Sequence, residues 1–392
     1  MKDKKKSPNL MALNNYSNKS KKIIIYCSVP IFDTWPKKWE LEKFSNYGLD
    51  LEIWSTEEIF YKLENIKAAA SGSGEYLYTD LPIYKIKNLI ELENRVSQLD
   101  SEAVICIMTL GSLNDNNFDN PDLDIFNKNK IKYVIHHLAP HFVVPSAWFK
   151  LKLNFRLLQK RLNNHKKKPY LIIGTGSEGR SQAFKIYRKK FIYKSLPSYN
   201  VLWFKQKPII DKKYVIYIEE NVNFSPDNNL FGTANSVLDT EGFYKRINDV
   251  FEKIENWTNL KVIIAASGKY DYEINPFKNR KIIYKKTSNL IQHSELVLGH
   301  KSSALEQAIV DYKPLLILKD HGFNNLRNKL IDSQAKCYRL DSIWTHKLTK
   351  TYFNKNNQVK KTLYNEVIKE YIKEENVTGN FLENIAAAFH EI

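Results

Sequence analysis

This sequence contains no long hydrophobic run, no recognisable leader and few cysteines. Its apolar runs, such as residues 315–318, are a few residues long, whereas a membrane-spanning helix needs about 20. The lysines near the N-terminus are not followed by the apolar segment of a secretory signal. The three cysteines, Cys27, Cys106 and Cys337, are widely spaced and match no metal-binding pattern, so we expect buried thiols in a reducing compartment. These absences favour a cytoplasmic protein.

Basic residues, by contrast, are in large excess. Sixty Lys and Arg residues stand against 43 Asp and Glu residues, which gives a net charge of +17. A charge of this size favours anionic partners: nucleic acid, anionic lipid headgroups or phosphorylated substrates. The base composition of the genome is an alternative explanation, because Asn, Ile and Tyr are abundant as well. No recognisable nucleic-acid-binding motif accompanies the charge, so we expect no nucleic-acid partner.

The length and the hydrophobic content of 43% suit two domains and exclude a wholly disordered chain. Residues 1–22 contain seven lysines and little that can pack, which predicts a disordered basic tail. The pattern then predicts a buried strand at 22–27, a helix at 36–47 that ends at Gly48, and a strand at 49–54. This β-α-β order is typical of a doubly wound domain, which we place at residues 23–205.

Further strands are expected in the first domain at 104–108, 133–136 and 170–173. Residues 68–74 are of low complexity and predict a flexible loop. Residues 147–162 predict a helix with one apolar stripe and many basic residues, followed by three lysines at 166–168. The stripe either packs on the sheet or lies on an anionic membrane surface, and the sequence leaves both open.

A linker is expected at 201–213, and a second β-α-β series follows it. Strands are predicted at 214–218, 261–266, 281–284, 296–299 and 315–318, with helices at 240–257, 288–293, 303–312, 362–374 and 380–389. We place the second domain at residues 206–375 and a C-terminal helix at 376–392. The predicted fold class is α/β, with two Rossmann-like domains that face a central cleft.

The sharpest local pattern is a strand that runs into a polar turn and a helix, Glu295-Leu-Val-Leu-Gly-His-Lys-Ser-Ser-Ala-Leu-Glu306. Ser303 is expected to be the N-cap of the helix, and Glu306 completes a capping box. Two hydroxyls, a lysine and the free N–H groups of the helix start suit a phosphate. A capped helix without a ligand explains Ser303 and Glu306 but leaves His300 and Lys301 unexplained.

Residues 296–318 resemble the His-x-Ser-Thr/Ser-Ala signature and the following Lys-Pro of bacterial surface-carbohydrate glycosyltransferases. These are GT-B enzymes that use CMP-activated 2-keto sugars of the pseudaminic acid, sialic acid and Kdo type. Residues 192–202, 218–227 and 243–277 are similar to further segments of the family, so the resemblance covers about residues 190–320. The chain departs from the family at Ser267-Gly268, where the family has His-Pro, and at Glu219, where the family has Asp.

The resemblance implies transfer of a nonulosonate- or Kdo-like sugar from a CMP-linked donor to a capsule or lipopolysaccharide glycan. A lipid-linked or glycan acceptor at the inner membrane surface would suit the basic charge. No cofactor beyond the donor substrate is implied. The alternative is a catalytically silent relative that binds carbohydrate or membrane. The donor-binding residues are expected to be Ser267, Lys269, His300, Lys301, Ser302 and Ser303.

Carboxylates follow the strand predicted at 214–218, where open α/β sheets bind ligands. Glu219, Glu220 and Asp227 are the catalytic candidates, as the nucleophile of a retaining transfer or the base of an inverting one. Solvated acids at a strand end are the alternative. Gly174 and Gly176 are expected to line the cleft, although their turn lacks the features of a P-loop or a dinucleotide fingerprint. The sequence contains no metal-binding motif of the His-Glu-x-x-His or Cys-x-x-Cys type, and we expect no metal.

Overall fold

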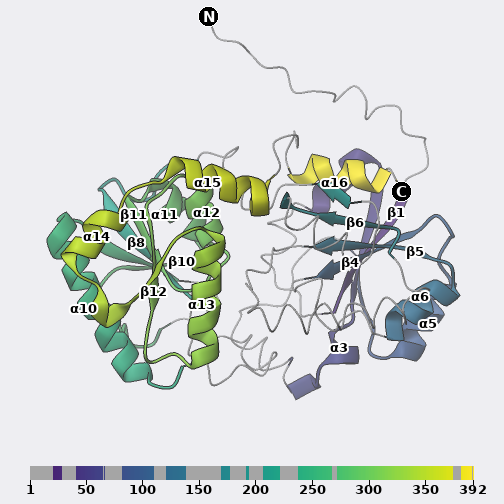
Figure 1. Ribbon diagram of the computed structural model, residues 1–392. Coiled ribbons are helices and arrows are strands. Elements are labelled where there is room, and N and C mark those ends of the chain that lie inside the picture. Colours follow the sequence, from purple (N-terminus) through teal and green to yellow (C-terminus); the bar gives the residue numbers. More distant parts are fainter. Residues whose placement is uncertain are drawn as a thin grey trace, which may run out of the picture.

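The computed structural model describes residues 21–28, 41–64, 66, 82–109, 121–137, 169–176, 191–193, 206–220, 237–266, 272–373, 381–390 and 392. These residues form two separate sheets, and every strand pair in both sheets is parallel (Figure 1). The expected two α/β halves are therefore confirmed.

The N-terminal sheet has seven strands in the order β3-β2-β1-β4-β5-β6-β7. Its strands are β1 (Lys21–Cys27), β2 (Leu49–Ser55), β3 (Ile83–Lys85), β4 (Val104–Thr109), β5 (Lys132–His137), β6 (Leu171–Gly174) and β7 (Phe191–Tyr193). The helices among the described residues are η1 (Leu41–Tyr47), α3 (Glu57–Phe60), α5 (Leu89–Ser97) and α6 (Pro121–Lys128). Gly48 has a φ of +69°, which explains why η1 ends there.

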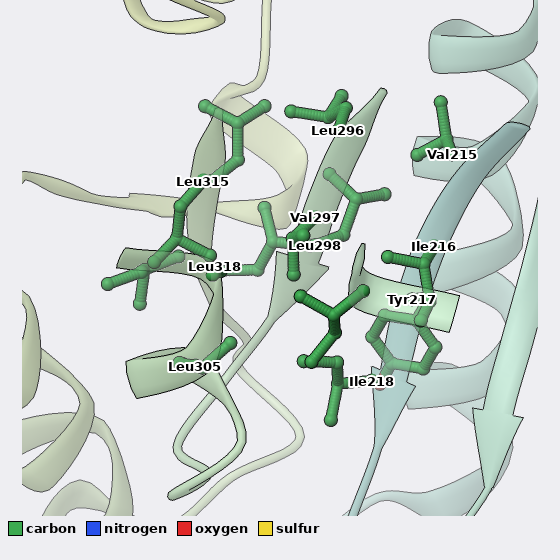
Figure 2. Packing of buried hydrophobic residues seen from close by; sticks show 14 of the residues in the cluster. Val215, Ile216, Tyr217, Ile218, Leu296, Val297, Leu298, Leu305, Leu315 and Leu318 are labelled. Atoms are coloured by element: carbon green, nitrogen blue, oxygen red, sulfur yellow. The ribbon is translucent and has the colours of Figure 1, made fainter. Parts of the chain in front are cut away.

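The C-terminal sheet has six strands in the order β10-β9-β8-β11-β12-β13. Its strands are β8 (Tyr214–Glu219), β9 (Lys261–Ala266), β10 (Ile282–Tyr284), β11 (Leu296–Gly299), β12 (Leu315–Lys319) and β13 (Ser342–Trp344). The central strands are continuous apolar runs because helices cover both faces of the sheet (Figure 2). Leu305, from the helix after β11, packs into the same core.

Helices α10 (Thr240–Thr258) and α14 (Lys350–Asn356) cover one face of this sheet, and α12 (Leu305–Val310) and α13 (Asn325–Cys337) cover the other (Figure 1). The remaining elements are α11 (Thr287–His293), η4 (Thr345–Lys347), α15 (Lys361–Val367) and the π-helix η5 (Ile368–Ile372). The sequence patterns had not predicted α13, β13 or α14.

The last helix, α16 (Phe381–His390), packs on the N-terminal half of the molecule (Figure 1). Phe389 lies 6.3 Å from Phe44 between ring centroids, and His390 Nε2 is 2.6 Å from the carbonyl oxygen of Tyr47. The chain thus ends on the half in which it began.

Some expectations fall wholly or partly outside the described residues. The low-complexity segment 68–74 and the basic helix 147–162 lie outside them. Of the tail 1–22, only Lys21 and Lys22 are described, and both belong to β1.

Candidate functional site

The order of the C-terminal sheet creates one point where the connections change direction. From β8 the chain moves to β9 on one side, and it later returns to β11 on the other side of β8. Such a switch point leaves a crevice at the carboxyl ends of the two strands, and open α/β sheets bind their ligands there. Glu219 and Glu220 stand at the end of β8, and Gly299, His300 and Lys301 stand at the end of β11.

Glu220 connects three elements at this switch point. Its Oε1 accepts the N–H of Lys301 at 2.5 Å, and its Oε2 accepts Nη2 of Arg327, in the first turn of α13, at 2.7 Å. Burial raises the pKa of the Glu220 carboxyl, while Arg327 and the Lys301 N–H oppose the rise. The side chains of Glu220 and Arg327 are 14% and 15% exposed, so solvent reaches the pair.

The polar turn after β11 offers hydrogen-bond donors. Among the described residues, no acceptor engages the backbone N–H groups of Ser302 and Ser303. The side chains of Lys301 and Ser303 are exposed beside these groups. Gly299 allows this turn to lie close to α12, because a Cβ at Gly299 would approach Leu305 Cδ2 to 2.8 Å. Two backbone donors, a hydroxyl and an ammonium group are the donor types that bind phosphate.

The expected capping box is wrong. Helix α12 begins at Leu305, its cap residue is Ala304, and no side chain caps it. Ser302 Oγ instead accepts the N–H of Ala304 at 3.3 Å, and Glu306 is buried. Ser303 is thereby left exposed rather than used as a cap.

His300 is not a residue of the turn surface, and its expected contact with the donor is corrected. Its side chain is fully buried, 4.9 Å from Phe323 between ring centroids. Nδ1 lies 2.7 Å from the carbonyl oxygen of Leu318, and Nε2 lies 2.9 Å from the Tyr217 hydroxyl. A carbonyl only accepts, so Nδ1 carries the proton and Nε2 accepts from Tyr217. Because burial lowers the pKa of His300 to about 4, the ring is neutral. Its hydrogen bonds link β11 to Leu318 of β12 and to Tyr217 of β8.

Glu219 lies on the other side of β8 from Glu220 and is 3% exposed. Its Oε1 accepts the hydroxyl of Tyr272 at 3.1 Å. Burial, and then the charge of Glu219, raise the pKa of the Tyr272 hydroxyl, so Tyr272 remains a donor to this carboxylate. Glu219 is therefore held inside the domain by Tyr272.

A buried carboxylate also supports the neighbouring loops. Asp320, after β12, accepts Nε and Nη2 of Arg246 at 3.0 and 2.6 Å and the hydroxyl of Thr345 at 2.5 Å. It further accepts the N–H of Gly322 at 2.7 Å. These bonds fix the loop after β12 to α10 and η4, beside the switch point.

No protein-family model matches this sequence, and no curated protein matches it. Solved structures match its fold. The chain is similar to the crystal structure of Acinetobacter baumannii MurG at 9% identity and a TM-score of 0.50, over 95% of this chain and 100% of that one. It is similar to the glycosyltransferase SnogD from Streptomyces nogalater at 9% identity and a TM-score of 0.51, over 95% and 99%. The glycotransferase of kitacinnamycin is similar at 8% identity and a TM-score of 0.50, over 95% and 99%.

The fold is GT-B. In this GT-B chain Gly174 and Gly176, which were expected to line the cleft, lie in the packed interior instead. Both glycines are buried, and a Cβ at Gly176 would lie 1.9 Å from the carbonyl oxygen of Glu370. Thr175 Oγ1 donates to the carbonyl oxygen of Tyr371 at 2.8 Å. This turn of the N-terminal half packs against η5.

Three candidate residues, Asp227, Ser267 and Lys269, lie outside the described residues. Within the described ranges, no group of three or more His, Cys, Asp or Glu side chains is arranged to hold a metal ion. No helix of the described part of this GT-B chain is long and apolar enough to cross a membrane.

Two residues of the candidate site, Arg327 and Tyr272, are not among those expected from the sequence. Asn324 caps α13 by accepting the N–H of Arg327, and Asn is a preferred N-cap residue, which makes it a usable helix-start signal. Glu220 and Arg327 are 107 positions apart in the sequence, and nothing in the sequence signals that the two side chains meet. Tyr272 follows β9 in a segment without a recognisable period.

Proposed function

We propose that this GT-B chain is a glycosyltransferase that binds a nucleotide-activated sugar at the switch point of its C-terminal sheet. The observation that carries the proposal is the convergence there of Lys301, the N–H groups of Ser302 and Ser303, and the Glu220–Arg327 pair. Cations and unengaged backbone donors beside carboxylates suit a substrate with a phosphate leaving group.

The phosphate would be bound by the N–H groups of Ser302 and Ser303, the Ser303 hydroxyl and the Lys301 ammonium group. Hydrogen bonds to a charged group contribute about 1.5–3 kcal/mol each. The sugar would extend from the phosphate along the ends of β8 and β11, towards the carboxylates. His300 takes no part in binding; its bonds to Leu318 and Tyr217 set the position of the turn.

For the donor we propose a CMP-linked 2-keto sugar, and for the acceptor a capsule or lipopolysaccharide glycan. The similarity of residues 296–318 to CMP-dependent transferases supports this choice. An acceptor at the inner membrane surface would place the basic protein next to anionic lipid, so we propose peripheral attachment there. The net charge of +17 supports attachment of this kind.

Glu219 is the proposed catalytic carboxylate, with Glu220 and Asp227 as alternatives. In a retaining transfer, a carboxylate displaces the nucleotide from the anomeric carbon, and the acceptor hydroxyl then displaces the carboxylate. In an inverting transfer, the carboxylate takes the proton of the acceptor hydroxyl as that oxygen attacks. Either role requires Glu219 to exchange its bond with Tyr272 for a contact with substrate.

A transfer assay tests the proposal. The full chain is incubated with CMP-linked and UDP-linked sugars and glycan acceptors, and both product formation and anomeric configuration are followed by NMR. We expect turnover with a CMP-linked 2-keto sugar and its loss in Glu219→Gln. Turnover with UDP-sugars alone would refute the CMP assignment, and normal turnover by Glu219→Gln would move catalysis to Glu220 or Asp227.

The burial of Glu219 favours a second function, that of a silent relative which binds carbohydrate without transferring it. A nucleophile needs reacting atoms about 3–3.5 Å apart, and Glu219 is 3% exposed and bonded to Tyr272. The two functions differ in one outcome. A silent relative binds donor or glycan while the parent and its Gln variants are equally inert across the donor panel.

A further inference from the structure

Three arginines of the C-terminal half, Arg246, Arg280 and Arg327, each bind a carboxylate that is less than a fifth exposed, and they differ in how many of their N–H groups contact it. An arginine side chain presents Nε–H and one Nη–H side by side, an arrangement that binds two oxygens of one oxyanion. Arg246 uses Nε and Nη2 for the carboxylate of Asp320. Arg280 uses Nε and Nη2 for Glu255, at 3.3 and 2.7 Å.

Arg327 uses only half of this arrangement. Nη2 binds Glu220 at 2.7 Å, but Nε is buried and has no acceptor among the described residues. The second oxygen of Glu220 is engaged elsewhere, because it accepts the N–H of Lys301. A buried donor without a partner is costly, at about 1–3 kcal/mol, and calls for an explanation. The ring of Phe323, 5.0 Å from Cζ, holds the guanidinium group in place.

Glu220 thus contacts the Lys301 N–H and Arg327 as an oxyanion of a ligand would, but it leaves Nε of Arg327 without a partner. It occupies one N–H of the turn after β11 and one N–H of Arg327, at the switch point where a ligand is expected. A tetrahedral phosphate has three terminal oxygens. It can take Nε and Nη2 of Arg327 and the N–H of Lys301 together, whereas the Glu220 carboxylate, in the position it has here, contacts Nη2 and the Lys301 N–H but leaves Nε without a partner.

We propose that Arg327 is an anion-binding residue of this site, and that Glu220 occupies it until an oxyanion of the substrate displaces the carboxylate. The inference rests on the proposed donor site and adds the residue that receives the charged group. The ligand chemistry is an oxyanion with several oxygens. It is supplied either by the phosphate of a nucleotide or by the carboxylate of a 2-keto sugar.

The exchange has a measurable consequence. In the parent, an incoming anion must displace a carboxylate that already neutralises Arg327. Removing that charge in Glu220→Gln leaves a partly buried cation without a counter-ion, which destabilises the free protein. The same change removes the competitor, so an oxyanion should bind more tightly and restore the lost stability.

The experiment compares Glu220→Gln with a matched control, Glu255→Gln. Both remove the carboxylate partner of a mostly buried arginine that lies against a phenylalanine ring. The control arginine keeps other acceptors, Asn248 and the carbonyl oxygen of Phe277. Glu255 also accepts the N–H of Val262, near the start of β9. This contact lies at the amino ends of the strands, whereas the switch point lies at their carboxyl ends.

Calorimetry and thermal denaturation are run with inorganic phosphate, CMP and free N-acetylneuraminic acid. We expect Glu220→Gln to melt lower than the parent, to bind phosphate and CMP about tenfold more tightly, and to regain its midpoint when they are added. Tighter binding of N-acetylneuraminic acid instead identifies the sugar carboxylate as the natural ligand. Glu255→Gln should melt lower without any gain in anion binding.

A second variant, Arg327→Gln, keeps the proposal testable if Glu220→Gln does not fold, and it should bind CMP about tenfold more weakly than the parent. Anion affinities equal to the parent in both Glu220→Gln and Arg327→Gln would overturn the proposal. If CMP still binds there and Ser303→Ala weakens that binding, the proposed donor site stands without Arg327. If no nucleotide binds any variant but phosphate restores Glu220→Gln alone, the proposed function fails and Arg327 remains an anion-binding residue.

Discussion

Replacing His300 with asparagine should make the free energy of unfolding fall less steeply as the pH is lowered below 6.5. In the folded protein, burial lowers the pKa of His300 to about 4, whereas an unfolded histidine titrates near 6.5. Below pH 6.5 the unfolded chain binds a proton that the folded ring does not bind. His300 therefore contributes its full stability above about pH 6.5, and this contribution is lost progressively as the pH falls towards 4.

The size of the effect follows from the two pKa values. Each pKa unit between the states corresponds to about 1.4 kcal/mol, so the interval from 6.5 to about 4 corresponds to about 3 kcal/mol. At pH 7 the His300→Asn variant should be less stable than the parent by about 1–3 kcal/mol, because the Tyr217 hydroxyl or the Leu318 carbonyl loses its partner. That difference should narrow steadily below pH 6.5.

The assay is urea denaturation followed by fluorescence at pH 4 to 7.5, for the parent and for His300→Asn. Carboxylates titrate in both proteins and cancel in the difference between them. A difference between His300→Asn and the parent that is the same at pH 5 and pH 7 would refute a neutral buried His300.

Three further outcomes follow from the structure. Gly176→Ala should lower the melting temperature much more than Gly48→Ala. Both glycines have a positive φ, but only at Gly176 would the added Cβ collide with backbone atoms, those of Glu370. Glu219→Gln should abolish transfer, measured by kinetics, and should leave the nucleotide affinity, measured by calorimetry, within about twofold of that of the parent. Binding to anionic vesicles, measured by co-sedimentation, should fall steeply as salt is added, because the Debye screening length shortens to ~3 Å at 1 M salt. Equal binding to neutral vesicles would contradict peripheral attachment.

The strands of the C-terminal half were predictable because parallel strands buried on both faces are continuous apolar runs. The predicted strands 261–266 and 296–299 coincide with β9 and β11. Helix α13 and strand β13 were missed for physical reasons. The helix buries polar residues such as Asn328 and Gln334, and the strand is three residues long and only partly buried, so neither shows a clear apolar period.

The site was predictable in position but not in detail. The strand–turn pattern located the polar turn at the switch point, because any loop after a central parallel strand reaches that edge. The direction of each side chain was not predictable. His300 turns into the core because Leu318 and Tyr217 provide its two partners there, and these contacts arise only when β8, β11 and β12 are assembled. The pairing of Glu220 with Arg327 depends on tertiary structure in the same way.

Calorimetric titration of the full chain with CMP and UDP tests whether a nucleotide phosphate binds at Ser302 and Ser303. We expect CMP to bind the parent, and Ser302→Ala combined with Ser303→Ala to weaken this binding by about 1–3 kcal/mol. Nucleotide binding that is unchanged in the double variant, or absent from the parent at every concentration tested, would contradict this expectation.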